Sequence, residues 1–290
     1  MKSGEKLTAA KSARLMRAMR KELGLSQQQV AAELQISQGT LSKMENQLLM
    51  PSAHEWLSFC VLAKIPPDSL LTGTLDSLTP VQLISGELSS GFRIPAKFLR
   101  DRASKVRAAI PFFRFLELKL GPKKSSEYLR SIKIDPDYFV DLDHELNLLF
   151  GLEVARFLSA KGLLTPADIS QMTESVALPE VQGRLYANYE AEKTTLPRIQ
   201  MLISNARFYE GNFDYQLEAA SANRIEFSIK PNPHLEVFGV AHDDELGDFL
   251  CTYKKSYFTH FADHKKVRLN EVECQFHGAQ KCVYQMKMAG

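Results

Sequence analysis

Residues 24–46, GLSQQQVAAELQISQGTLSKMEN, carry the signals of two short helices joined by a tight turn. Ser26 and Gln29 have the spacing of a capping box, which predicts the start of the first helix. Ser37 can cap the second helix, and Gln35 lies in the turn between them. Because apolar residues recur at helical spacing in both segments, each predicted helix has one face to bury.

Three further helices are expected around this pair. Upstream, residues 8–23 show helical periodicity that stops at a glycine, as at a C-terminal cap. Downstream, Pro51 opens a helix whose Trp56 we expect in the core, and a shorter helix ends near Gly73. These signals predict a compact all-α module of five helices over residues 1–73.

The same stretch, extended back to Arg14 and on to Leu71, resembles the helix-turn-helix domain of the Cro and phage-repressor class, often called the XRE family. That family needs a small residue where its two motif helices cross, and Ala31 has this position. The family usually has Gly in the turn, where left-handed backbone is wanted; Gln35 replaces it at a cost of about 1 kcal/mol. The apolar contacts of the motif would come from Val30, Leu34, Ile36, Leu41 and Met44.

The resemblance implies that the second motif helix enters the major groove of double-stranded DNA at an operator. Gln can pair bidentately with adenine, and Lys can donate to guanine. Gln27 would bind a backbone phosphate, and Gly39 would allow close approach. Arg20 and Glu45 match a buried ion pair of the family. The full set of expected DNA-contacting residues is Gln27, Gln38, Gly39, Thr40 and Lys43.

The distribution of charge agrees with this assignment. The 290 residues carry a net charge of +2, with +4 on residues 1–50 and −2 on the remainder, so a polyanionic partner is expected at the N-terminal end. The chain lacks an N-terminal secretory stretch and any apolar run of roughly 18 residues, so we expect a cytoplasmic protein that makes no membrane contact. A helical protein-interaction domain is the alternative for the N-terminal module.

Beyond the module, the sequence divides into three parts. Residues 74–92 have the composition of a linker, residues 93–178 are helical and match no family, and residues 179–290 combine strands with a helix. A hairpin is expected at Ala222 and Asn223. Helical periods are seen over residues 96–110, 112–120, 123–132, 142–162 and 167–176. The predicted fold class is α+β: an all-α helix-turn-helix domain, then an α+β sensor domain with helices packed on an antiparallel sheet.

About the last 80 residues resemble the C-terminal half of the four-vinyl-reductase domain, the sensor of phenol- and xylene-responsive activators. The resemblance rests on a helix that carries a cysteine, a strand reading Glu-Val-x-Cys, a turn with Gly, and a second Cys that opens another strand. In the phenol sensors these positions hold a structural zinc. Carried over, the expected zinc ligands are Cys251, Glu271, Cys274 and Cys282.

The residues themselves leave the cysteine site open. Strand periodicity places Glu271 and Cys274 on opposite faces unless a bulge intervenes. Three thiolates and a carboxylate form a closed tetrahedral set, which favours a structural over a catalytic zinc. A metal-free cluster of buried thiols and a redox pair of Cys274 with Cys282 are the alternatives. His277 on the turn and the His260–His264 pair are expected to be polar surface rather than ligands.

The expected effector is a small hydrophobic or aromatic molecule in an apolar pocket between helices and sheet. The phenol sensors orient the ligand hydroxyl with a His and a Trp, whereas the only tryptophan here is Trp56, so a fatty or other hydrophobic molecule is an equal candidate. The candidate lining residues are Phe208, Tyr209, Phe213, Tyr215, Phe227, Phe238, Phe249 and Tyr253.

These features together predict a one-component transcription regulator that acts as a homodimer, because a single helix-turn-helix reads few bases. A scaffold or dimerisation protein is one rival. A metal- or thiol-dependent enzyme is the other, and we expect no enzyme because the ligand set is closed and no nucleotide-binding glycine motif is present. The absence of GxxxxGK[ST] also excludes the ATP-dependent route of the phenol-responsive activators.

Overall fold

The computed structural model divides the chain into two compact units, which are described separately. One comprises Met1–Pro95 and Ser126–His144, and the other Ala96–Ser125 and Glu145–Gly290. In the described part of the chain, no helix is long and apolar enough to cross a membrane. The structure describes residues 3–75, 92–100, 104–178, 181, 189, 191–192, 194–206, 210–221, 223–232, 244–262 and 267–288. Most of the expected linker (74–92) and position 222 of the expected hairpin lie outside these ranges.

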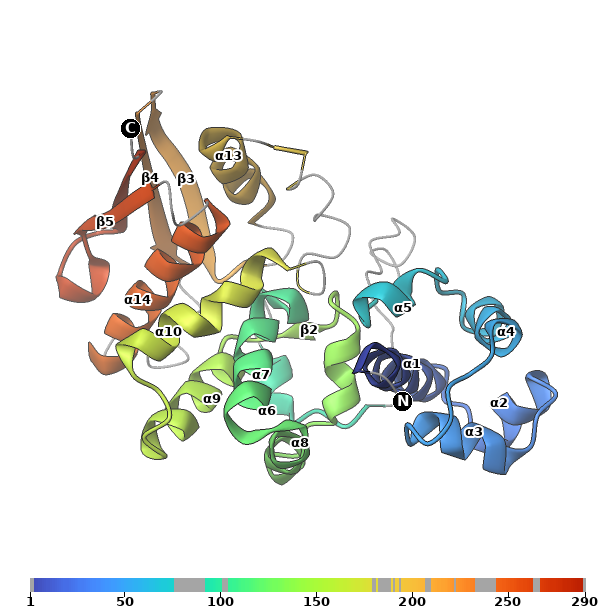
Figure 1. Ribbon diagram of the computed structural model, residues 1–290. Coiled ribbons are helices and arrows are strands. Elements are labelled where there is room, and N and C mark those ends of the chain that lie inside the picture. The colour runs from blue at the N-terminus through green and yellow to red at the C-terminus, as the bar shows by residue number, and fades with distance from the viewer. Residues whose placement is uncertain are drawn as a thin grey trace. The chain divides into compact units, whose positions relative to one another are not determined.

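The N-terminal unit starts with the expected all-α module, drawn in blue to cyan in Figure 1. Its core is apolar and fully enclosed, with Leu15, Val30, Leu41, Met44 and Phe59 all 0% exposed. Its helices are α1 (Ser3–Glu22), α2 (Gln27–Glu33), α3 (Gln38–Glu45), α4 (Ala53–Ala63) and α5 (Ser69–Thr72).

Local capping fixes where the two motif helices begin. The Ser26 side chain accepts from the Gln29 backbone N–H at 3.2 Å, and the Gln29 side chain accepts from the Ser26 N–H at 2.8 Å, which completes the capping box. Between α2 and α3 the chain turns through Gln35 at φ 55°, in the left-handed region. Ala31 is 2% exposed, in keeping with a close crossing of the two helices.

A segment from much later in the chain completes the N-terminal unit. The 3-10 helix η1 (Pro136–Val140) lies against α1, where Arg17 donates to both carboxylate oxygens of Asp137 at 3.1 Å. Lys21 binds Asp135 at 2.6 Å and Asp137 at 2.8 Å. Burial alone would raise the pKa of Asp137, but the two cations outweigh it and lower that pKa. The expected helical region 93–178 is therefore divided between the two units.

The helices of the second unit differ from the predicted pattern in several places. Residues 106–120 form one helix across two expected segments, the helix expected over 142–162 begins only at Leu149, and the helix Thr195–Asn205 was not predicted. The single helix expected over 96–110 is replaced by a short helix, a strand and a new helix, because Ser104 and Lys105 pair antiparallel with Leu146 and Glu145. The helices and short strands are α6 (Ala96–Leu99), β1 (Ser104–Lys105), α7 (Val106–Leu120), α8 (Pro122–Ser131), β2 (Glu145–Leu146), α9 (Leu149–Ala160), α10 (Pro166–Thr173), η2 (Glu174–Ala177), α13 (Thr195–Asn205) and α14 (Asp244–Phe261). Helix α8 spans the point where the chain passes from one unit to the other.

A four-stranded antiparallel sheet forms the other layer of this unit, in the order β3-β4-β6-β5. Helix α14 lies beside it (Figure 1), and the ring centroids of Phe258 on α14 and Phe227 on β4 are 4.4 Å apart. The α+β class with helices on an antiparallel sheet is thus confirmed. The strands are β3 (Phe213–Ala220), β4 (Arg224–Pro231), β5 (Val267–Glu273) and β6 (Cys282–Met288).

The left-handed turn residue gives a test of stability. Replacing Gln35 with Gly should raise the free energy of unfolding by up to about 1 kcal/mol, because Gly adopts positive φ without a Cβ clash. Chemical denaturation of the full chain, followed by circular dichroism, would measure the change. In the matched control Gln28→Gly, inside α2, stability should fall by about 1 kcal/mol. Equal effects of the two substitutions would contradict the strain at position 35.

Candidate functional site

The start of helix α3 presents the side chains that the resemblance assigns to DNA bases. Gln38, Gly39 and Lys43 are exposed, and Thr40 is half-buried. The Ser37 side chain accepts from the Thr40 backbone N–H at 3.0 Å, and the two hydroxyls lie 2.8 Å apart. This cap fixes the helix N-terminus, where backbone N–H groups favour an anion such as a phosphate.

A buried carboxylate organises the residues behind this surface. Glu45 is 1% exposed and accepts from Arg20 at 2.6 and 2.9 Å. Gln27 donates to Glu45 at 2.8 Å, and Gln38 donates to Gln27 at 2.7 Å. A continuous chain of hydrogen bonds therefore joins the ion pair to the exposed start of α3, and links residues to which the resemblance assigned separate roles.

Gly39 has room for a side chain within the fold. A Cβ there would meet only the Ser37 hydroxyl oxygen, at 3.8 Å, an ordinary van der Waals contact. The domain itself therefore does not require glycine at this helical position.

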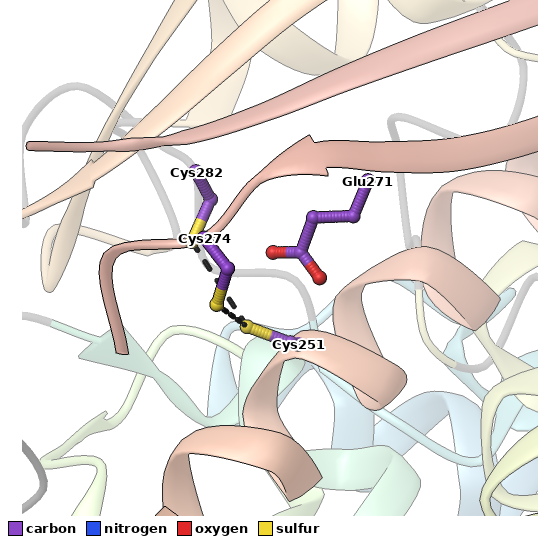
Figure 2. Close-up of side chains that lie close together, drawn as sticks. All are labelled: Cys251, Glu271, Cys274 and Cys282. Carbon is purple, nitrogen blue, oxygen red and sulfur yellow. Dashed lines mark hydrogen bonds between the residues drawn. The ribbon is translucent and has the colours of Figure 1, made fainter. Parts of the chain in front are cut away.

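The second site is a cluster of three cysteines and one glutamate in the C-terminal unit. Cys251 lies on α14, Glu271 on β5, Cys274 directly after β5, and Cys282 at the start of β6. Figure 2 shows the four side chains pointing toward one another. Their ligand atoms all lie within 4.8 Å of one another, so the structure brings together all four residues that the sequence named as metal ligands.

A β-bulge resolves the conflict with strand periodicity. Glu271 lies opposite Tyr284 on β6, whereas Glu273 lies opposite the adjacent Val283, so the register shifts between them. The extra residue, Val272, is 49% exposed. Because a bulge changes the alternation of faces, Glu271 and Cys274 can face the same site.

The turn after β5 brings Cys274 and Cys282 together. The Cys274 carbonyl accepts from the backbone N–H groups of His277 and Ala279, both at 3.1 Å, and Gly278 closes the turn at φ 94°. His277 is exposed and pairs with Asp248 at 2.9 Å. This histidine therefore points away from the cluster.

The chemistry of the donors fits a metal ion. The Cys251 hydrogen bond lowers the pKa of Cys282 to about 7, with help from the charge of Lys254, so one thiolate is favoured near neutral pH. The same contact, together with burial, raises the pKa of Cys251. Among the described residues, Glu271 Oε1 is buried without a hydrogen-bond partner, a costly state that a cation would relieve. Three sulfurs and one carboxylate oxygen match a tetrahedral structural zinc site.

No disulfide joins the sulfurs of this cluster. The Cys251 sulfur lies 3.4 Å from that of Cys274 and 3.9 Å from that of Cys282, well beyond the roughly 2.05 Å of an S–S bond. Both contacts involve the helix cysteine. The three sulfurs therefore lie together around Cys251, and Cys274 and Cys282 do not form an isolated pair on the hairpin.

A third feature is a partly open cavity of about 60 Å³ in the C-terminal unit, here named the α14 cavity. Apolar side chains supply most of its wall, and helix α14 contributes the largest share. Besides Ser104, Asn147 and Gly151, its lining includes Ala108, Phe112, Leu202, Glu210, Leu250 and Lys254.

The predicted pocket residues are only partly at this cavity. Three of them line it: Phe213, Tyr215 and Tyr253. Phe227 does not, because it stacks between Phe258 and Tyr284 in the sheet core, and Phe249 packs near Phe112 without lining it. The candidates Phe208, Tyr209 and Phe238, as well as His264, lie outside the described residues.

Two charged residues that line the cavity, Lys254 and Glu210, were not predicted from the sequence. Lys254 is 6% exposed, and burial lowers its pKa to about 8. Burial raises the pKa of Glu210, although hydrogen bonds from Asn212 oppose the shift. A signal for Lys254 was present, since it shares a helical stripe with Leu250 and Tyr257.

Comparison with known protein families finds a match within the N-terminal unit. The helix-turn-helix family model matches residues 16–70. These residues form an XRE-type helix-turn-helix domain. No curated protein matches the chain.

Among solved structures, the chain is similar to H-NOX proteins. One from S. oneidensis in the Fe(II)NO ligation state has 11% identity and a TM-score of 0.45, and the match covers 64% of this chain and 99% of that one. An unliganded Fe(II) H-NOX protein from K. algicida has 11% identity and a TM-score of 0.43, over 64% and 97%. An oxygen-binding H-NOX domain related to soluble guanylate cyclases has 12% identity and a TM-score of 0.44, over 64% and 95%. Similarity at this level supports no functional inference, and the four-vinyl-reductase resemblance stays a prediction.

The approach of α14 to the hairpin turn can be tested directly. A Cβ at Gly247 would lie 2.7 Å from Phe276 Cγ and 2.8 Å from its Cβ, so Gly247→Ala should lower the free energy of unfolding by about 1–3 kcal/mol. Denaturation of the full chain measures this. In the double variant with Phe276→Ala, the cost of the added methyl group should largely vanish. Additive costs of the two substitutions would contradict the close approach.

Proposed function

We propose that this chain is a one-component, DNA-binding transcription regulator whose C-terminal unit responds to a small hydrophobic or aromatic ligand. The observation that carries the proposal is the helix-turn-helix domain with an exposed, capped α3 bearing Gln38, Gly39 and Lys43. The net charge of +4 on residues 1–50 supports binding to a polyanion. The α14 cavity is the candidate effector site.

The regulator would act as a homodimer on an operator with two half-sites, because one recognition helix reads few base pairs. The effector would bind one of two states of the dimer more tightly than the other. Because the two states differ in their affinity for the operator, effector binding would change DNA affinity. No catalytic role is part of this proposal.

The cysteine cluster would hold a structural zinc in this proposal, with Cys251, Glu271, Cys274 and Cys282 as ligands. The unsatisfied Glu271 oxygen and the convergence of donors within 4.8 Å support it. When bound, the ion would cross-link α14 to the β5–β6 hairpin. With four protein ligands it has no open position for a water molecule, which is the arrangement of structural sites.

DNA binding is tested by selecting the preferred duplex with the wild-type chain and then measuring variants by fluorescence anisotropy at one salt concentration. Lys43→Ala should weaken binding about 5- to 150-fold, the loss of one base contact worth about 1–3 kcal/mol. Gly39→Ala should also weaken binding, because the added methyl group faces the duplex, while the helix becomes as stable or more so.

The matched control is Lys161→Ala, which removes an exposed positive charge from the C-terminal unit. It should leave DNA affinity almost unchanged. If Lys43→Ala bound the selected duplex as tightly as the wild type, the assignment of α3 as the recognition helix would fail.

The metal is tested by elemental analysis of the full chain purified without added zinc. We expect about one equivalent per chain, as a single tetrahedral site requires. The double variant Cys274→Ser and Cys282→Ser should lose the metal and unfold at a lower temperature, since metal binding contributes to folding. Cys60→Ala, at a cysteine that is buried in α4 of the N-terminal unit and is not part of the cluster, should retain the metal. A metal-free wild-type chain as stable as the metal-supplemented one would overturn the proposal.

A further inference from the structure

Two polar side chains in the α14 cavity have no hydrogen-bond partner among the residues that the structure describes. Both sit on one turn of α14: Lys254, 6% exposed, and Tyr253, 9% exposed. Within the described part of the chain, the Tyr253 hydroxyl is buried without a partner. The Lys254 ammonium group has no acceptor there and lies 2.9 Å from the centroid of the Phe213 ring.

Such groups are costly when a cavity is dry. An unsatisfied buried hydroxyl costs roughly 1–3 kcal/mol, and a buried charge without an acceptor costs more. Native structures pair nearly all such groups with protein, water or ligand. A Tyr hydroxyl and a Lys ammonium group on adjacent residues can donate to one shared acceptor group.

The carboxylate of Glu210 does not serve as that acceptor. Its Oε1 accepts from the Ser104 hydroxyl at 3.1 Å and from the Asn212 backbone N–H at 2.8 Å. Among the described residues, no carboxylate oxygen lies within the 4.0 Å ion-pair distance of Lys254 Nζ. The cation therefore faces the cavity without a direct counter-ion.

The remaining wall is mostly apolar, with Ser104, Asn147 and the hydrogen-bonded Glu210 among its polar members. Ala108 and Phe112 come from α7, Leu202 from α13, and Leu250 from the preceding turn of α14. A molecule with one anionic end and a compact apolar body matches this distribution, as ligand sites commonly join an apolar wall to a few convergent polar groups.

We propose that the α14 cavity binds a small organic acid, whose carboxylate accepts hydrogen bonds from Lys254 Nζ and the Tyr253 hydroxyl and whose apolar body packs against Phe112 and Leu202. The cavity of about 60 Å³ has space for several water molecules, which restricts the ligand to a short-chain or single-ring acid. This inference rests on the ligand-responsive half of the proposed function and narrows the effector from any hydrophobic molecule to a carboxylic acid.

Lys254 has a competing role that the test must separate. Its charge also acts on Cys282 and Cys251. The alternative is therefore that Lys254 balances the charge of the cluster thiolates and binds no ligand. In that role, removing the charge would change the pKa of the cluster or its metal affinity. It would not create a preference among ligands in the cavity.

The experiment is isothermal titration of the full chain with butanoate, 3-methylbutanoate and benzoate, each compared with its amide. At least one acid should bind about tenfold or more tightly than its amide, because a hydrogen bond to a charged group is among the stronger ones. Lys254→Met should abolish this preference while preserving the apolar volume. Tyr253→Phe should weaken the acid severalfold and retain the preference.

The matched control is Lys255→Met, which removes the neighbouring charge of α14 at a position outside the cavity lining, and it should bind the acid as the wild type does. Ala108→Leu, which fills the cavity, should block acids and amides alike. This second variant tests the cavity without changing Lys254, so the inference stays testable if the Lys254 variant folds poorly. Equal binding of acid and amide, survival of the preference in Lys254→Met, or no binding of any acid would overturn the inference. If the selected DNA duplex is still bound in those cases, only this inference fails.

Discussion

The C-terminal unit depends on how closely helix α14 approaches the turn between β5 and β6. Gly247 faces Phe276 with no space for a Cβ, and one turn later Cys251 lies 3.4 Å from Cys274. This contact fixes the position of a helix that carries Cys251 of the cysteine cluster and the polar end of the α14 cavity. Because α14 also covers the sheet, displacement of the helix would disturb core, cluster and cavity together.

The N-terminal unit is organised by a buried carboxylate. Glu45 is removed from water, which is stable only because Arg20 and Gln27 both donate to it. Arg17 donates to the backbone carbonyl of the same residue and also binds Asp137 on the segment that completes the unit. Through Gln27 this buried network reaches the exposed start of α3, so the orientation of the recognition surface is tied to the core.

Most of the helix-turn-helix domain could be predicted because its signals are local. Ser26, Ser37 and Gln29 act within one helical turn of their own positions, and apolar spacing specifies the buried face. Sequence reasoning failed where backbone pairing over long distances decided the structure, as at Ser104, which joins a strand with Leu146 instead of continuing a helix. The assignment of Phe227 to a pocket failed for a related reason, since periodicity predicts that a side chain is buried but does not predict what it faces.

The sequence by itself determined the helix-turn-helix domain and the α+β class, since these follow from short-range capping and periodicity, whereas the four residues of the cysteine cluster were expected only from the resemblance to the phenol sensors. Tertiary structure alone decided whether Glu271 and Cys274 share a face, because the bulge in β5 arises from its pairing with β6. It also decided that Lys254 is buried at a cavity while the adjacent Lys255 is not part of its wall. A helical stripe specifies which side of α14 points inward, but only the packing of α7, α13 and β3 against that side leaves a space beside the charge.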